Sequence, residues 1–239
     1  MQSKNMVINM KTEKIYIENI PALLIGDKTD KAYLFVHGKM GQKEEALEFA
    51  KLAVPMGYQV LAIDLPKHGE RKSGKDEFAP WVAVPEIKAV YKFMQKRWQS
   101  ISLRATSIGA WFSMMALSNL PIKKALLVSP VVDMENLIKN MMTWASVSEE
   151  QLKQQGEIST SFGETLSWKY LCFVRDNPYE WTTPTEILYA DGDNLTARSI
   201  IDEFAQEHSA GITVMQNGEH WFHTKEQLDF LIGWEREHI

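Results

Sequence analysis

Cysteine is almost absent from this sequence, since Cys172 is the single one among 239 residues. One cysteine can form neither an internal disulfide nor a cysteine-based metal cluster, so both are excluded. Cys172 lies in the apolar run Tyr170-Leu171-Cys172-Phe173-Val174. We therefore expect it to be a small buried apolar residue.

Long apolar runs and blocks of like charge are also missing. No stretch approaches the roughly 20 apolar residues of a membrane-spanning helix, and lysines interrupt residues 1–14 where a signal peptide would need an apolar core. A formal net charge of −5 argues against the basic face with which proteins bind nucleic acid. We expect a cytoplasmic protein with neither a membrane span nor a nucleic-acid partner, and its oligomeric state is left open.

Short β-branched runs alternate with longer amphipathic stretches along the chain. Apolar residues at Ala46, Phe49, Ala50 and Ala53 follow helical spacing, as do those around Ile87. Strands that are apolar at nearly every position indicate an α/β fold, with a mostly parallel sheet covered by helices on both faces. The first two strands are close enough to form an antiparallel hairpin. The predicted strands cover 14–17, 22–25, 32–36, 60–63, 101–105, 125–128, 187–189 and 212–215.

One interval is too long for a single crossover helix. More than fifty residues separate the strand that ends near Ser129 from the strand that starts near Glu186. We expect one domain over residues 1–239, with an insertion over 133–184 that caps the candidate site. Apolar residues from Met134 to Met142 have helical spacing, which suits a helix that packs on the body, lines a pocket, or does both.

A sharp strand-to-helix turn is predicted around Ser107. The segment Arg104-Ala105-Thr106-Ser107-Ile108-Gly109-Ala110 contains Ala-x-Ser-x-Gly, a variant of the Gly-x-Ser-x-Gly nucleophile elbow. Small residues two before and two after the serine are needed because larger side chains would collide in the turn. Ser107 is therefore the candidate nucleophile, as opposed to an ordinary helix-capping serine.

A serine nucleophile needs a base and a carboxylate that orients the base. In this architecture the acid and then the histidine follow the serine in the chain. His220 comes just after the last predicted strand and is the candidate base, with His223 as its rival. Asp193 follows the second-to-last predicted strand, over residues 187–189, and comes directly after the turn at Gly192. It is the candidate acid. Asp191 and Asp133 are the alternatives.

The strand over residues 32–36 runs into His37-Gly38-Lys39, where this architecture supplies an oxyanion donor. We expect the backbone N–H groups of Lys39 and Ile108 to form the oxyanion hole, with Met40 as the second choice to Lys39. His37 lies at the start of this loop, and we expect it to be structural.

The next loop, from Asp64 to Arg71, follows a strand and contains a proline and a glycine. We expect Asp64 and Arg71 to pair and His68 to be structural. The acidic and histidine residues lack the spacing of metal ligands, so no metal site is predicted.

Taken in order, these landmarks resemble the α/β-hydrolase superfamily from about Tyr33 to the end of the chain. The loop with His68 resembles that of small bacterial esterases near the prolyl-oligopeptidase and dienelactone-hydrolase branches. The resemblance implies an eight-stranded, mostly parallel sheet and two-step acyl transfer, with Ser107, Asp193 and His220 at its triad positions. Ala105 and Ala190 depart from the pattern, since glycine is more frequent at both positions.

The sequence thus predicts a serine hydrolase that cleaves carboxylic esters of a small or medium acyl group through an acyl-enzyme, with no metal or organic cofactor. Its partner is expected to be a small-molecule ester or amide substrate. An aminopeptidase or amidase with the same triad is the alternative enzyme, and a non-catalytic binding protein on a hydrolase scaffold is the alternative of another class. The expected substrate pocket contains Trp81, Trp111, Met141 and Trp144.

Overall fold

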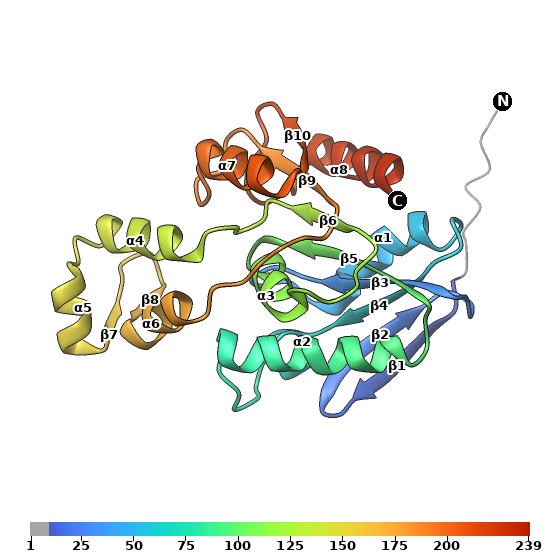
Figure 1. Cartoon of the computed structure of the whole chain (residues 1–239), viewed down its shortest axis with the longest axis horizontal. Helices are drawn as coiled ribbons and strands as arrows, with labels where there is room; N and C mark the ends of the chain where they lie inside the picture. Colours follow the sequence, from blue (N-terminus) through green and yellow to red (C-terminus); the bar gives the residue numbers. More distant parts are fainter. Residues whose placement is uncertain (1–9) are drawn as a thin grey trace.

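An eight-stranded sheet runs through the centre of the computed structural model, which describes residues 10–239 (Figure 1). The strand order is β1-β2-β4-β3-β5-β6-β9-β10. β1 and β2 form an antiparallel hairpin, β2 is antiparallel to β4, and the other neighbours are parallel. The predicted mostly parallel sheet is confirmed. Its strands are β1 (Thr12–Ile17), β2 (Ile20–Ile25), β3 (Lys31–Val36), β4 (Gln59–Ile63), β5 (Ser100–Thr106), β6 (Ala125–Val128), β9 (Thr185–Ala190) and β10 (Gly211–Met215).

Helices cover both faces of the sheet, as expected. The core on one face packs against α1 (Ala46–Ala53) and α8 (Lys225–His238). The core on the other face packs against α2 (Pro80–Gln95), α3 (Ser107–Leu117) and α7 (Arg198–His208). Two short 3₁₀ turns, η1 (Lys43–Glu45) and η2 (Gly69–Arg71), lie in the loops after β3 and β4.

Side chains along each central strand alternate between these two cores. In β3, Leu34 and Val36 contact the α2/α3 core, whereas Tyr33 and Phe35 contact the α1/α8 core. Successive side chains of a strand point to opposite faces, so a sheet covered twice needs an apolar residue at nearly every position. This explains why the strands are continuously apolar in the sequence.

The chain between β6 and β9 forms a separate group of small elements, which we call the inserted segment (residues 133–184). It extends from one end of the sheet in Figure 1. Met134, Ile138 and Met142 form the buried stripe of its first helix, which confirms the helix predicted there. Two strands of three residues each escaped prediction because they are too short to show a period. The elements are α4 (Met134–Trp144), α5 (Glu149–Gln155), β7 (Glu157–Ser159), β8 (Thr165–Ser167) and α6 (Trp168–Asp176).

The structure tests the expected burial of Cys172 and the expected lack of a membrane-spanning helix. Cys172 lies on α6 and is partly exposed, so the prediction of a buried residue is wrong. No helix in residues 10–239 is long and apolar enough to cross a membrane. Cytoplasmic location stays a prediction.

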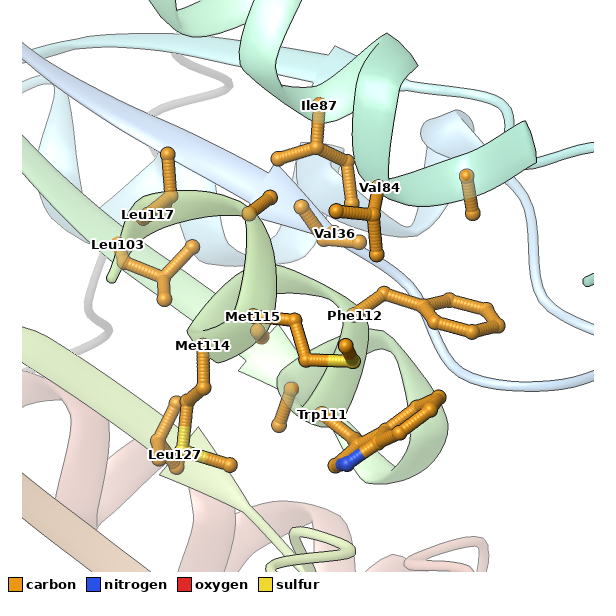
Figure 2. Close-up of a cluster of buried hydrophobic side chains, with 14 of the residues drawn as sticks. Val36, Val84, Ile87, Leu103, Trp111, Phe112, Met114, Met115, Leu117 and Leu127 are labelled. Atoms are coloured by element: carbon orange, nitrogen blue, oxygen red, sulfur yellow. The ribbon is translucent and has the colours of Figure 1, made fainter. Parts of the chain in front are cut away.

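Helix α3 is the most deeply buried helix near the candidate site, with nine of its eleven residues buried. Figure 2 shows its aromatic and methionine side chains between those of α2 and of the strands β3, β5 and β6. An apolar helix surrounded in this way is fixed by packing on all sides. The residue at its first turn therefore has a well-defined position.

Candidate active site

Ser107 lies at the junction of β5 and α3, in a strained backbone conformation. Its φ is +51°, in the left-handed region that residues other than glycine rarely adopt. Gly109 makes the turn possible, because a Cβ at that position would lie 2.1 Å from the backbone oxygen of His37. Strain at a single residue held by a packed helix is typical of functional positions.

Three side chains that are far apart in the sequence meet at this turn. Ser107 Oγ lies 2.8 Å from His220 Nε2, and His220 Nδ1 lies 2.6 Å from Asp193 Oδ2. Both distances are within hydrogen-bond range, so the three groups form a continuous line. The serine comes from the end of β5, the acid from the loop after β9 and the histidine from the loop after β10.

Asp193 is held at both of its carboxylate oxygens, and its side chain has no exposed area. Oδ1 accepts hydrogen bonds from the backbone N–H groups of Leu195 and Thr196, at 2.8 and 3.0 Å, which leaves Oδ2 for His220. The two alternative acids do not hydrogen-bond to His220. Asp191 is exposed, and Asp133 caps α4 by accepting from the backbone N–H of Asn136.

The rival histidine His223 does not reach the serine. It is exposed, its ring stacks on Trp221, and its Nδ1 lies 2.7 Å from the backbone oxygen of Trp221. His220, three residues earlier, is half-buried and is the histidine within reach of Ser107.

The loop after β3 lies beside the serine, since a Cβ added to Gly38 would lie 3.3 Å from the Cβ of Ser107. Met40 is excluded as an oxyanion donor, because its N–H donates to His68 Nε2 at 2.9 Å. Within residues 10–239, the Lys39 N–H has no acceptor, and Lys39 lines the cavity beside Ser107. Ile108 lies in the first turn of α3, where N–H groups have no partner within the helix.

His37 and His68 are structural, as expected, and both accept hydrogen bonds through Nε2. His37 accepts from the backbone N–H of Leu65 at 3.1 Å, while its Nδ1 lies 2.7 Å from the backbone oxygen of Gly38. Burial lowers the pKa of His37 to about 4 and also lowers the pKa of His68. Both rings are therefore neutral near pH 7, the state in which Nε2 can accept.

The expected pairing of Asp64 with Arg71 is wrong. The Asp64 carboxylate accepts from Lys43 Nζ at 2.7 Å, and both side chains are almost fully buried. Arg71 instead pairs with Glu86 at 2.6 Å and with Asp76 at 3.0 Å. From Asp64 it reaches the backbone oxygen and not the carboxylate. Lys43 lies 21 positions before Asp64, and no sequence pattern links the two.

Comparisons with known proteins find similar solved structures but no similar sequence family. The sequence matches no family model and none of the curated proteins. Solved structures similar to 95% of this chain include the esterase Est1E from Butyrivibrio proteoclasticus with bound ferulic acid (17% identity, 97% of that chain, TM-score 0.73). Others are the alpha/beta hydrolase domain-containing protein 10 from mouse (11%, 97%, 0.73) and the Pyrococcus furiosus esterase Pf2001 (18%, 89%, 0.67).

The chain has the α/β-hydrolase fold. In that fold the nucleophile and its two partners follow the carboxyl ends of strands, and Ser107, Asp193 and His220 occupy such ends. At these levels of identity the likeness concerns the fold, and the roles of the three residues are taken up below.

A cavity of about 580 Å³ opens beside Ser107, between the α/β-hydrolase core and the inserted segment. This volume is within the range of small-molecule sites. The body contributes Ile108, Val131 and Phe78, and the inserted segment contributes most of the remaining wall. Of the four predicted pocket residues, Met141 and Trp144 line this cavity.

Trp81 and Trp111 do not line it, so that part of the prediction is wrong. Both rings lie behind Tyr170, which does line the cavity: Trp111 stacks on Tyr170 with 6.0 Å between ring centroids, and Trp81 meets it edge-on at 5.9 Å. Trp111 instead borders a second cavity of about 690 Å³, away from Ser107. The two tryptophans thus support the wall without forming its surface.

Sequence reasoning missed the contact between the loop after β3 and the inserted segment. Lys39 Nζ forms an ion pair with Glu164, which lies in the turn between β7 and β8, and both residues line the cavity. Phe162 in the same turn meets Trp144 edge-on at 6.1 Å. Lys39 and Glu164 are more than a hundred positions apart, and nothing in their spacing could have indicated the ion pair.

Proposed function

We propose that this protein is a serine hydrolase that cleaves carboxylic esters of a small or medium apolar acyl group. The observation that carries the proposal is the unbroken hydrogen-bonded line from Ser107 through His220 to a fully buried carboxylate, with distances of 2.8 and 2.6 Å. The esterases among similar solved structures support the same reaction class.

In the first step, Ser107 Oγ attacks the ester carbonyl carbon while His220 Nε2 accepts the hydroxyl proton. Asp193 holds the ring so that Nδ1–H points at the carboxylate, and it stabilises the imidazolium that forms. The backbone N–H groups of Lys39 and Ile108 donate to the carbonyl oxygen as it becomes negative. One such donor is worth about 10²–10³ in rate.

Collapse of this intermediate breaks the bond to the alcohol oxygen, which takes the proton from His220 and leaves. A water molecule then attacks the acyl-enzyme, again with His220 as base, and releases the carboxylic acid and free Ser107. The atoms balance with water as the only co-reactant, so these residues can complete the cycle with no further chemical group.

The inserted segment is proposed to act as a cap that holds the acyl group. Its helix α4 turns Met134, Ile138 and Met141 toward the cavity beside Ser107. Four aromatic residues also line this cavity, namely Phe78, Trp144, Phe162 and Tyr170. The structure of Est1E that holds ferulic acid is a further reason to test aromatic acyl groups alongside straight chains.

A panel of p-nitrophenyl esters with straight-chain and aromatic acyl groups tests the proposal. Wild type should hydrolyse several of them, and Ser107→Ala should lose activity and labelling by a fluorophosphonate. Ser113→Ala is the matched control, because Ser113 lies in the same helix and its hydroxyl donates to the backbone oxygen of Gly109. Equal hydrolysis by wild type and Ser107→Ala would refute the proposal.

The same proteins separate the alternatives. Hydrolysis of aminoacyl amides at rates above those of the esters would instead indicate an aminopeptidase or amidase. A wild type that takes no fluorophosphonate label, beside a control hydrolase that does, would indicate a binding protein without catalysis.

A further inference from the structure

A buried ion pair lies beneath the Ser107 turn, on the face of the sheet that α8 covers. In β5, Leu103 and Ala105 belong to the α2/α3 core, so Arg104 and Thr106 project toward the opposite face. Arg104 there meets Glu235 of α8. Arg104 is 4% exposed and Glu235 is 3% exposed.

The guanidinium of Arg104 contacts three different elements. Its Nε donates to Glu235 Oε1 at 2.9 Å, and one terminal nitrogen donates to the hydroxyl of Thr106. Its carbon atom lies 5.1 Å from the ring centroid of Phe35, the residue directly opposite in β3. The planar, forked guanidinium can make these contacts at once, and a lysine could not.

A buried ion pair of this kind is not expected to add much to the free energy of unfolding. Removing two charges from water costs free energy that their attraction often fails to recover, and apolar replacements of similar size are often neutral or stabilising. Phe35 and Trp234 belong to the core on this face, and the charge of Arg104 also acts on the carboxyl group of Glu45. The contacts must therefore be explained by what they hold in position.

What Arg104 holds is the residue before the proposed nucleophile. Thr106 has an extended backbone and directly precedes the left-handed turn at Ser107. Its γ-methyl group would lie 3.4 Å from a Cβ added to Gly38, so it packs closely under the loop that carries Lys39. The hydrogen bond from Arg104 fixes the rotamer of Thr106 and, with it, this contact.

Glu235 connects the same cluster to the base. It belongs to α8, which begins at Lys225, five positions after His220. One buried ion pair therefore joins β5, the strand that leads into Ser107, to α8, the helix that follows the His220 loop.

We propose that Arg104 is a positioning residue, which acts through Thr106 and Glu235 to align the Ser107 turn with the loop of Lys39 and with His220. This rests on the proposed hydrolase function. A misplacement of about 1 Å caused by a change away from the chemistry can cost about 10²-fold in rate. The expected defect is thus in kcat, since Arg104 lines no part of the substrate cavity.

The test replaces the pair by apolar residues in an Arg104→Met/Glu235→Met double variant, and removes the hydroxyl alone in Thr106→Val. We expect both proteins to fold, with kcat lowered by about 10²-fold in the double variant and KM nearly unchanged. Arg198→Met/Asp202→Met, which removes an exposed arginine–carboxylate pair on α7, is the control and should keep the wild-type kcat.

Thermal unfolding and the rate of fluorophosphonate labelling are measured on the same samples. A folded double variant with wild-type kcat and labelling rate would overturn the proposal while leaving the hydrolase function intact. If the double variant fails to fold, Thr106→Val decides, and a wild-type kcat there overturns the proposal equally. A wild type that neither hydrolyses esters nor takes the label would refute the hydrolase function itself, and the positioning role with it.

Discussion

Replacing Asp193 by asparagine is a sharp test of the proposed triad, because the surroundings dictate which way the new amide turns. The carboxylate accepts from the N–H groups of Leu195 and Thr196 through one oxygen and faces His220 with the other. Turning an NH₂ group toward those two donors would leave them unsatisfied, at about 1–3 kcal/mol each. The amide oxygen therefore stays with the two backbone donors, and the NH₂ group donates to His220 Nδ1.

This arrangement puts the ring proton of His220 on Nε2, where no lone pair remains to accept the proton of Ser107. When the histidine of a triad is held in the wrong tautomer, kcat falls by a factor on the order of 10⁴, which corresponds to about 5.4 kcal/mol of activation free energy. We expect Asp193→Asn to unfold near the wild-type temperature and to lose p-nitrophenyl ester hydrolysis by this factor.

Asp191→Asn is the control, since Asp191 is exposed on the same turn, and it should hydrolyse at the wild-type rate. The reasoning would be refuted if folded Asp193→Asn kept its kcat within about tenfold of wild type, because a misdirected imidazole costs far more than that.

Three further predictions follow from single contacts. Gly109→Ala should fail to fold stably or to take a fluorophosphonate label, because the new Cβ would lie 2.1 Å from a backbone oxygen; a labelled protein with wild-type Tm would contradict this. The low pKa of His37, about 4 against 6.5, means that the unfolded chain binds this proton first as pH falls. Urea unfolding should therefore show about 2 kcal/mol less stability from this residue at pH 5 than at pH 7, a loss reduced in His37→Gln and retained in His223→Gln. Met141→Ala should shift the preferred p-nitrophenyl ester to a longer acyl chain, because it deepens the cavity beside Ser107; an unchanged chain-length profile would remove Met141 from the acyl site.

The sheet could be predicted from the sequence because its physical requirement is simple. A strand covered on both faces must be apolar throughout, and in β3 and β4 every interior position is. Ser107, Asp193 and His220 could be brought together in prediction for a related reason. Each follows a strand, and the carboxyl ends of neighbouring parallel strands lie at one edge of the sheet.

The errors concern side chains whose direction depends on tertiary packing. Trp81 and Trp111 are large and aromatic, as pocket residues often are, but only the docking of α6 on α2 and α3 decides that they lie behind Tyr170. Charge pairing failed for a similar reason. Asp64 has Arg71 seven positions away in sequence, and yet the fold brings Lys43 to its carboxylate.

The ion pair between Lys39 and Glu164 joins the body to the inserted segment, but it contributes too little free energy to hold the two together by itself. Both side chains are more than 40% exposed, and an exposed pair contributes about 0–1 kcal/mol. The aromatic contacts of Tyr170 with Trp81 and Trp111 are better placed to do so. Aromatic pairs add about 0.5–1.5 kcal/mol each beyond the area that they bury.

The loop that carries Lys39 is instead fixed from the body by His68. Its Nε2 accepts the Met40 N–H, which keeps that donor out of the site, whereas the Lys39 N–H has no acceptor within residues 10–239. Only a neutral ring can do this, and burial lowers the pKa of His68 so that the ring stays neutral near pH 7. Acid would therefore reach the proposed site through His68, because protonation of its ring would release the loop that carries Lys39. His68→Gln lacks this route, so its fluorophosphonate labelling should slow less steeply with falling pH than that of wild type.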